Sequence, residues 1–215
     1  MALIQEKDRE EIRKRFAKMT RPVKFIMFTQ DFECDYCKET RQILEELAEL
    51  SDKLTLEVHD FIKDKELAEK YHVDKIPATV IEGEKDYGIR FYGIPSGYEF
   101  ATLIEDVIMV SNGDSMLSPE SREKLKALQK PVHIQVFVTP TCPYCPRAVF
   151  LAHQFAMESD KVTADMVEAT EFPHLANRYE VMGVPKTVAN DRPAAEGALP
   201  EPHFLDHILN AIEQN

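Results

Sequence analysis

The four cysteines of this chain fall into two Cys-x-x-Cys pairs, Cys34 with Cys37 and Cys142 with Cys145. A secreted scaffold that is stapled by disulfides would be shorter than 215 residues and richer in cysteine. Two interpretations remain: two redox-active dithiols, or one structural zinc site that binds all four thiolates. The pairs are 105 positions apart (142 − 37), whereas a compact zinc motif separates its pairs by roughly 15–20. This spacing favours two separate dithiols.

An internal repeat with an offset of 108 positions runs through the sequence. The offset relates the two cysteine pairs (142 − 34), and it also relates Pro77 to Pro185 (185 − 77). The residues around these prolines are alike, in segments 71–80 and 179–188. We therefore expect two domains of the same layout rather than one large domain.

The division between the two domains is expected near residues 111–115, a polar stretch of turn-forming residues. Ser118 and Pro119 follow it and indicate a helix start, with serine as the N-cap and proline at the first helical position. The predicted domains are therefore 1–113 and 114–215.

Each half alternates apolar strands with amphipathic helices, which predicts the α/β class with a central mixed β-sheet flanked by helices. Residues 23–29 and 132–138 are expected to be central strands, and each leads into a cysteine pair and then a helix. A hairpin and a last helix close each unit. The strand signal is weak in the second hairpin, where Pro193 suits only an edge strand or a bulge.

The charge balance excludes one broad class of partner. Lysine and arginine number 26 against 38 aspartates and glutamates, for a net charge of −12, so no nucleic acid is expected to bind. No apolar run approaches the roughly 20 residues of a membrane helix, and the N-terminal residues lack the apolar core of a secretory signal. No membrane association and a cytoplasmic location are therefore expected.

A cysteine pair between a strand and a helix has a direct chemical use. The positive N-terminal end of the helix stabilises a thiolate, and the thiolate is the nucleophile of disulfide exchange. Cys34 and Cys142, placed at the helix start, are the expected nucleophiles. Cys37 and Cys145, one turn further along, are expected to resolve the mixed disulfide with the substrate.

The redox chemistry is expected to need no cofactor beyond the cysteines. The sequence lacks the G-x-G-x-x-G fingerprint of a bound nicotinamide or flavin. Its histidines form no metal signature such as His-Glu-x-x-His, so no metal site is expected. Electrons must then be exchanged with another protein or with glutathione.

The residues around the second pair, Thr-Cys-Pro-Tyr-Cys at 141–145, resemble a glutaredoxin active site. Ile76–Pro77 and Val184–Pro185 resemble the cis-proline segment that faces the cysteine pair in thioredoxin folds. With two such units, the chain is similar to the glutaredoxin-like protein disulfide oxidoreductases of thermophilic archaea and bacteria, from about residue 6 to 213. Its charged fraction of 30% is compatible with a thermophilic source.

That resemblance implies two tandem thioredoxin-like folds and thiol–disulfide exchange on protein substrates, by reduction, oxidation or isomerisation. It implies that Pro77 and Pro185 are cis, and that the backbone of Ile76 and Val184 pairs with an extended substrate segment. It also implies a thioredoxin-reductase-like protein or glutathione as the electron donor. An electron carrier that serves one peroxidase or reductase partner and a zinc-binding module remain as alternatives.

Two features set the chain apart from thioredoxins. It has no tryptophan, and a tyrosine lies inside each pair, Tyr36 in the first and Tyr144 in the second, where it could contact substrate. The strand before each pair also lacks the acid that thioredoxins use for proton transfer. Glu57, Asp165 and Glu168 lie in neighbouring strands and could replace that acid, but solvated strand-end positions are expected for them.

The two pairs are expected to differ in acidity. Nearby anions disfavour a thiolate, and three acids precede or lie inside the first pair: Asp31, Glu33 and Asp35. The second pair has Pro143 inside it and Arg147 after it. Cys142 is therefore the expected more acidic thiol, and its disulfide the more oxidising.

Overall fold

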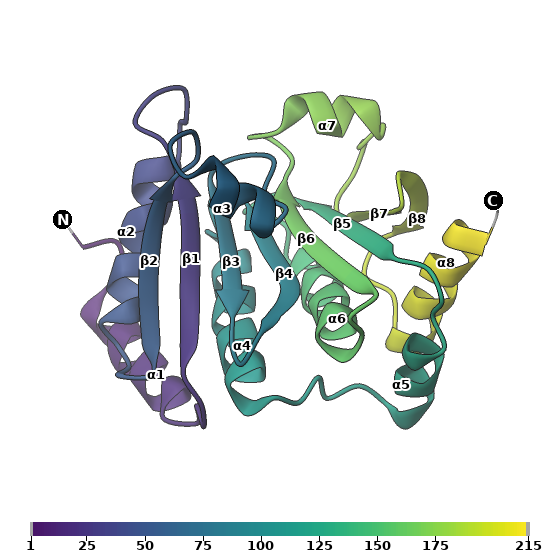
Figure 1. Cartoon of the computed structure of the whole chain (residues 1–215), viewed down its shortest axis with the longest axis horizontal. Helices are drawn as coiled ribbons and strands as arrows, with labels where there is room; N and C mark the ends of the chain where they lie inside the picture. The colour runs from purple at the N-terminus through teal and green to yellow at the C-terminus, as the bar shows by residue number, and fades with distance from the viewer. Residues whose placement is uncertain (1, 214–215) are drawn as a thin grey trace.

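The first half of the chain builds a four-stranded sheet with helices around it (Figure 1). Its strands are β1 (Val23–Thr29), β2 (Leu54–Asp60), β3 (Ala78–Glu82) and β4 (Asp86–Tyr92). Its helices are α1 (Glu6–Phe16), α2 (Cys37–Ala48), α3 (Lys65–Lys70) and α4 (Glu99–Asn112). In this computed structural model, which describes residues 2–213, β1 pairs in parallel with β2 and antiparallel with β3, and β3 pairs antiparallel with β4.

The second half repeats this arrangement. Its strands are β5 (Val132–Val138), β6 (Val162–Glu168), β7 (Lys186–Ala189) and β8 (Arg192–Glu196). Its helices are α5 (Pro119–Lys126), α6 (Cys145–Glu158), α7 (Pro173–Arg178) and α8 (Glu201–Glu213). β5 pairs in parallel with β6 and antiparallel with β7, and β7 pairs antiparallel with β8. The predicted α/β repeat with a mixed sheet in each half is confirmed.

The two sheets are joined edge to edge, which nothing in the sequence indicates. β4 pairs in parallel with β6, from Ile89 opposite Ala164 to Tyr92 opposite Val167. The result is one eight-stranded sheet in the order β2-β1-β3-β4-β6-β5-β7-β8. Because β1 and β5 run in the same direction through this sheet, the cysteine pairs follow the same, C-terminal ends of these two parallel strands.

Side chains on the two faces of the sheet pack into separate apolar clusters. Along β1, Phe25 and Met27 belong to the larger cluster, whereas Ile26 and Phe28 belong to the smaller one, as the alternation of a strand requires. All four side chains are at most 1% exposed. The larger cluster includes residues of α1, α2, α4, α5, α6 and α8, and the smaller cluster lies under α3 and α7 (Figure 1).

A short connection between α4 and α5 contains the predicted division of the chain. Gly113 caps α4 in the left-handed conformation, with φ of 70°. Ser118 accepts a hydrogen bond from the Ser121 N–H, and Pro119 occupies the first turn of α5. The predicted helix start at these two residues is confirmed.

The second hairpin forms despite its weak strand signal. β8 is the last strand of the sheet, so Pro193 lies on an edge strand. The pairing of β7 with β8 also shifts register between Thr187 and Val188. Both of the settings that tolerate proline, the sheet edge and a local irregularity, are therefore present.

Candidate active sites

Each cysteine pair forms a disulfide in the loop between a strand and a helix, with 5.5 Å between the Cα atoms in both pairs. α2 begins at Cys37 and α6 begins at Cys145. Cys34 and Cys142 therefore lie in the loop just before the helix. The expectation that the first cysteine of each pair opens the helix is wrong, because the second cysteine does so.

The first cysteine of each pair is the more accessible one. Cys34 is half-buried and Cys37 is 4% exposed. Cys142 is 7% exposed and Cys145 is fully buried. An incoming thiol or disulfide can thus reach the first sulfur more readily than the second in both halves.

The sulfur of Cys142 receives direct support from the backbone. The N–H of Cys145, at the first position of α6, donates to Cys142 Sγ at 3.1 Å. A free N–H at a helix start favours negative charge on the atom that it contacts. The same sulfur lies 3.7 Å from the carbonyl oxygen of Val184, which can accept from the Cys142 thiol in the dithiol form.

Both predicted cis prolines are confirmed. The Ile76–Pro77 and Val184–Pro185 peptide bonds are cis, and both prolines are buried at the start of an inner strand. The carbonyl of Pro77 accepts from the Gly93 N–H at 2.9 Å, and the carbonyl of Pro185 accepts from the Gly197 N–H at 2.8 Å. Each segment is thereby fixed to the residue that directly follows the second strand of its hairpin, β4 or β8, in the same way in both halves.

Tyr36 and Tyr144 lie on the surface beside their cysteine pairs. Their side chains are 44% and 69% exposed. Each tyrosine directly precedes the first residue of its helix. Both rings are therefore accessible from the side where a substrate would approach.

The expected solvated positions of two acids are wrong. Asp165 and Glu168 are only 4% and 2% exposed, and Asp165 contacts the His133 ring at 2.6 Å. The reason is the pairing of β6 with β4, which makes β6 an inner strand of the joined sheet. Glu57 does lie on an edge strand, half-exposed and paired with Lys24.

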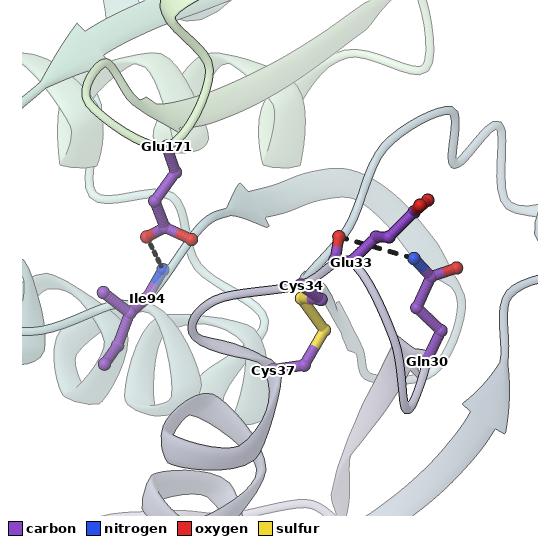
Figure 2. The surroundings of a disulfide bond; sticks show 6 residues. All are labelled: Gln30, Glu33, Cys34, Cys37, Ile94 and Glu171. Carbon is purple, nitrogen blue, oxygen red and sulfur yellow. Dashed lines mark hydrogen bonds between the residues drawn. A yellow bond between two sulfur atoms is a disulfide. The ribbon is translucent and has the colours of Figure 1, made fainter.

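A carboxyl group of the second half reaches the surroundings of the first cysteine pair (Figure 2). Glu171 follows β6, and its Oε1 accepts from the Ile94 N–H at 2.6 Å. Burial raises the pKa of Glu171 to about 7, and the nearby carboxylates of Glu168 and Asp35 act in the same direction. No short-range sequence pattern marks this residue, because its contact joins two segments that are 77 positions apart.

A carboxyl group of the first half lies next to a contact with the loop of the second pair. The N–H of Tyr98 donates at 3.0 Å to the carbonyl of Pro140, two residues before Cys142. The next residue, Glu99, begins α4 and is 1% exposed. Burial raises the pKa of Glu99 to about 7. Each half thus contributes a hydrogen bond next to the cysteine pair of the other half, through Glu171 at the first pair and through the Tyr98 N–H at the second.

Metal clusters and membrane-spanning helices are both absent from the described part of the chain. Within residues 2–213, no three or more histidine, cysteine, aspartate or glutamate side chains come together in a way that could hold a metal ion. Over the same residues, none of the helices combines the length and apolar character needed to span a bilayer. The two cysteine pairs are separately closed by their own disulfides.

The model of the thioredoxin domain family matches the chain twice, over residues 26–105 and 132–210. A protein disulfide oxidoreductase from Aeropyrum pernix K1 is similar in structure, with a TM-score of 0.92 and 33% identity over 98% of this chain and 94% of that one. The N-terminal N/C domain of the alkyl hydroperoxide reductase AhpF from Enterococcus faecalis V583 has a TM-score of 0.88 and 28% identity, covering 95% of this chain and 99% of that one.

Curated relatives are longer than this chain. The alkyl hydroperoxide reductase AhpF of Escherichia coli K12 is 23% identical over 197 residues, which cover 92% of this chain and 36% of that protein. An NADH dehydrogenase of Bacillus subtilis 168 is 23% identical over 178 residues, 82% of this chain and 32% of that protein. The chain therefore spans about a third of the length of these relatives. The family match to both halves, and the identity to a disulfide oxidoreductase over nearly the whole length, show that the chain belongs to the thioredoxin domain family, among its two-domain protein disulfide oxidoreductases.

Proposed function

We propose that this chain catalyses thiol–disulfide exchange on protein substrates at two independent sites, with the four cysteines as its only redox groups. Cys34 and Cys142 act as nucleophiles, and Cys37 and Cys145 resolve the mixed disulfides. The observation that carries this assignment is the difference in exposure within each pair, since the first sulfur is the more accessible one in both halves.

The exchange balances without any further redox group. In the reducing direction, the thiolate of the first cysteine attacks one substrate sulfur, and the substrate S–S bond breaks to leave a thiolate that takes up a proton. The thiolate of the second cysteine then attacks the sulfur of the first, and the second substrate thiolate leaves and is protonated. Two electrons and two protons pass from the dithiol to the substrate, and the reverse sequence oxidises a substrate dithiol.

Substrate binding is proposed at the cis-proline segments and at the two tyrosines. The backbone of Ile76 and Val184, just before the buried prolines, pairs with an extended substrate segment in the manner of an added strand. Tyr36 and Tyr144 then contact side chains of the same segment. The half-exposed positions of Ile76 and Val184 support this placement.

The partner that restores the cysteines is proposed to be a thioredoxin-reductase-like protein or glutathione. A second candidate is a narrower electron carrier that serves one reductase or peroxidase. The similarity to the N-terminal N/C domain of the alkyl hydroperoxide reductase AhpF favours this second candidate as far as the fold is concerned. General turnover of unrelated protein disulfides would instead favour thiol–disulfide exchange on many protein substrates.

A redox titration with separate detection of each pair tests the proposed function. Chelator-treated protein is equilibrated in graded thiol–disulfide buffers, its free thiols are alkylated, and each pair is followed by mass spectrometry. Two independent two-electron transitions are expected, together with reduction of insulin disulfides by the reduced protein. A parallel sample of untreated protein whose four thiols stay protected until a chelator removes zinc, without any intramolecular disulfide, would overturn the proposal.

A further inference from the structure

An apolar groove lies beside the first cysteine pair. Its volume is about 340 Å³, and it opens between the N-terminal segment, the start of α2 and the loop from β4 to α4. The apolar side chains that line it are Leu3, Ile4, Ile43, Ile94 and Phe100. Figure 2 shows Ile94 among the surroundings of the Cys34–Cys37 disulfide. The groove therefore lies near the first cysteine pair, with Ile94 and Glu39 as its lining residues on that side.

The rim of this groove is acidic. Asp8 and Glu39 line it together with the apolar side chains, and Glu39 lies on the first turn of α2, two residues after Cys37. Phe32, two residues before Cys34, is 81% exposed. The approach to the first pair thus combines apolar surface with negative charge.

The charges around the first pair are absent from the second. The charged residues flanking the first pair are Asp31, Glu33, Asp35, Lys38 and Glu39, with a formal sum of −3. The offset of 108 aligns them with Thr139, Thr141, Pro143, Pro146 and Arg147, with a formal sum of +1. Every one of the five positions changes its charge, so the two sites present different fields to the same substrate.

We propose that the groove is a specificity subsite of the Cys34–Cys37 pair, and that it selects disulfide-bearing protein segments in which an apolar side chain lies beside lysine or arginine. The apolar side chain enters the groove, and the basic residues lie against Asp8, Glu39 and the acids that flank Cys34. This inference rests on the proposed function, because it names the substrate class of one of its two sites.

The physical basis is charge complementarity at a site that is open to solvent. Exposed charges of one sign raise the rate of encounter with a ligand of the opposite sign by roughly 10–10³ at low ionic strength, and salt removes the effect. Burial of one leucine-sized side chain adds selectivity of its own. The preference for basic residues in the substrate should therefore weaken with salt. The preference for an apolar side chain should be insensitive to salt.

The test uses single-turnover reduction of synthetic disulfide peptides by the full chain. The variant C142S/C145S retains only the first pair, and C34S/C37S retains only the second. Each is reduced, freed of reductant and mixed with peptides whose two residues next to the disulfide are both lysine or both glutamate. Two electrons pass from the cysteine dithiol to the peptide disulfide, so the second-order rate constant can be read without a coupling enzyme.

The first pair is expected to reduce the lysine peptide about tenfold or more faster than the glutamate peptide at low salt, and less than about threefold faster in 0.5 M NaCl. The second pair is expected to show no preference for lysine. The triple variant D31N/E33Q/D35N of the first-pair protein should bring its ratio close to one. The matched control D52N/E120Q/E123Q removes the same number of negative charges from exposed positions before β2 and on α5, and it should keep the preference.

The contribution of the apolar groove is tested with two forms of the lysine peptide, which have either leucine or serine beside the lysines. The first pair should lose about three- to tenfold in rate with the serine peptide. L3S, which changes a half-exposed lining residue, should lower the rate for the leucine peptide only. Equal rates for all peptides at the first pair, or the same lysine preference at the second, would overturn the inference and leave the proposed function intact. If neither pair reduces any peptide, the proposed function itself is wrong.

Discussion

The two cysteine pairs occupy equivalent positions in the repeat but differ in what surrounds them. The same 5.5 Å separates the Cα atoms in both pairs, and a cis proline precedes an inner strand beside each. At the second pair, the N–H of Cys145 donates to the sulfur of Cys142, which is nearly buried. At the first pair, Cys34 is half-buried among acidic residues. The repeat thus keeps the geometry of the reaction and varies the electrostatic setting of each sulfur.

Acidic residues also lie where each half contacts the other. Glu99 of the first half follows the residue that binds the loop of the second pair, and Glu171 of the second half binds the Ile94 N–H near the first pair. Burial raises the pKa of both to about 7. Glu99 is almost completely buried, whereas Glu171 is half-buried. Each half therefore makes a hydrogen bond next to the cysteine pair of the other half.

The largest expected effect is the loss of one site at a time. C34S should lower thiol–disulfide exchange at the first pair by about 10³-fold or more, because a serine hydroxyl is far less nucleophilic than a thiolate at neutral pH. C142S should do the same at the second pair. Each rate is measured by single-turnover reduction of a neutral peptide disulfide. Loss of turnover at both pairs in either single variant would contradict the view that the two pairs are separate sites.

The next largest effect concerns the pH dependence of the stability of the folded chain, through the buried carboxyl of Glu99. The carboxyl of Glu99 has an ordinary pKa of 4.5 and a pKa of about 7 in the folded chain, so the folded state binds its proton more tightly than the unfolded state. Below pH 4.5 the ionisation of this carboxyl does not affect the free energy of unfolding. Between pH 4.5 and 7 it lowers that free energy progressively, and above pH 7 the loss is complete. At 1.36 kcal/mol per unit, the full cost is up to about 3 kcal/mol.

Replacement of this group by a neutral amide removes that cost. E99Q is expected to raise the free energy of unfolding by up to about 3 kcal/mol at pH 8 and to leave it nearly unchanged at pH 4. Urea denaturation of the parent and the variant at both pH values measures this. A gain of the same size at both pH values would show that the carboxyl is not the cause.

A smaller effect is expected where the two halves meet at the second pair. Gly97 has φ of +60°, and a Cβ there would lie 2.1 Å from the carbonyl oxygen of Pro140. G97A should lower the free energy of unfolding by about 2–3 kcal/mol and slow exchange at the second pair more than at the first. Gly197 has a similar φ of +78° with nothing within 4 Å of a Cβ, so G197A should cost only about 1 kcal/mol. Equal losses for the two variants would remove the steric contact as the cause.

The smallest expected effect is the order of ionisation of the two nucleophiles. The backbone N–H at its sulfur should lower the pKa of Cys142 below that of Cys34, whose neighbouring acids act in the opposite direction. Alkylation of the reduced protein with iodoacetamide as a function of pH, followed by mass spectrometry of each peptide, measures the order. Alkylation of Cys34 at the lower pH would reverse the comparison, and with it the prediction that the second disulfide is the more oxidising.

The sequence was sufficient for the local parts of this structure. The Cys-x-x-Cys motif identified both cysteine pairs, and the resemblance of Ile76–Pro77 and Val184–Pro185 to a cis-proline segment predicted both cis bonds, because each depends on a short motif. The apolar runs that form β1 and β5 were visible for the same reason. Ser118 and Pro119 marked a helix start because capping is a property of adjacent residues.

The parts that could not be predicted depend on how the halves meet. The pairing of β4 with β6 has no sequence signal, and it decides that Asp165 and Glu168 are buried. The approach of Glu171 to the first pair and the contact of Tyr98 with the loop before Cys142 also depend on how the two halves meet. Residue spacing within one half contains no information about a contact with the other half.

The way in which the halves join raises the question of whether the same junction forms between molecules. β4 and β8 are equivalent strands of the repeat, as are β6 and β2. The same junction, repeated between molecules, would place β2 of one copy beside β8 of another and produce an open-ended polymer. β8 has only five residues, and Pro193 within it lacks the N–H that a neighbouring strand would need. This short, proline-containing edge acts as a cap that makes polymerisation unfavourable.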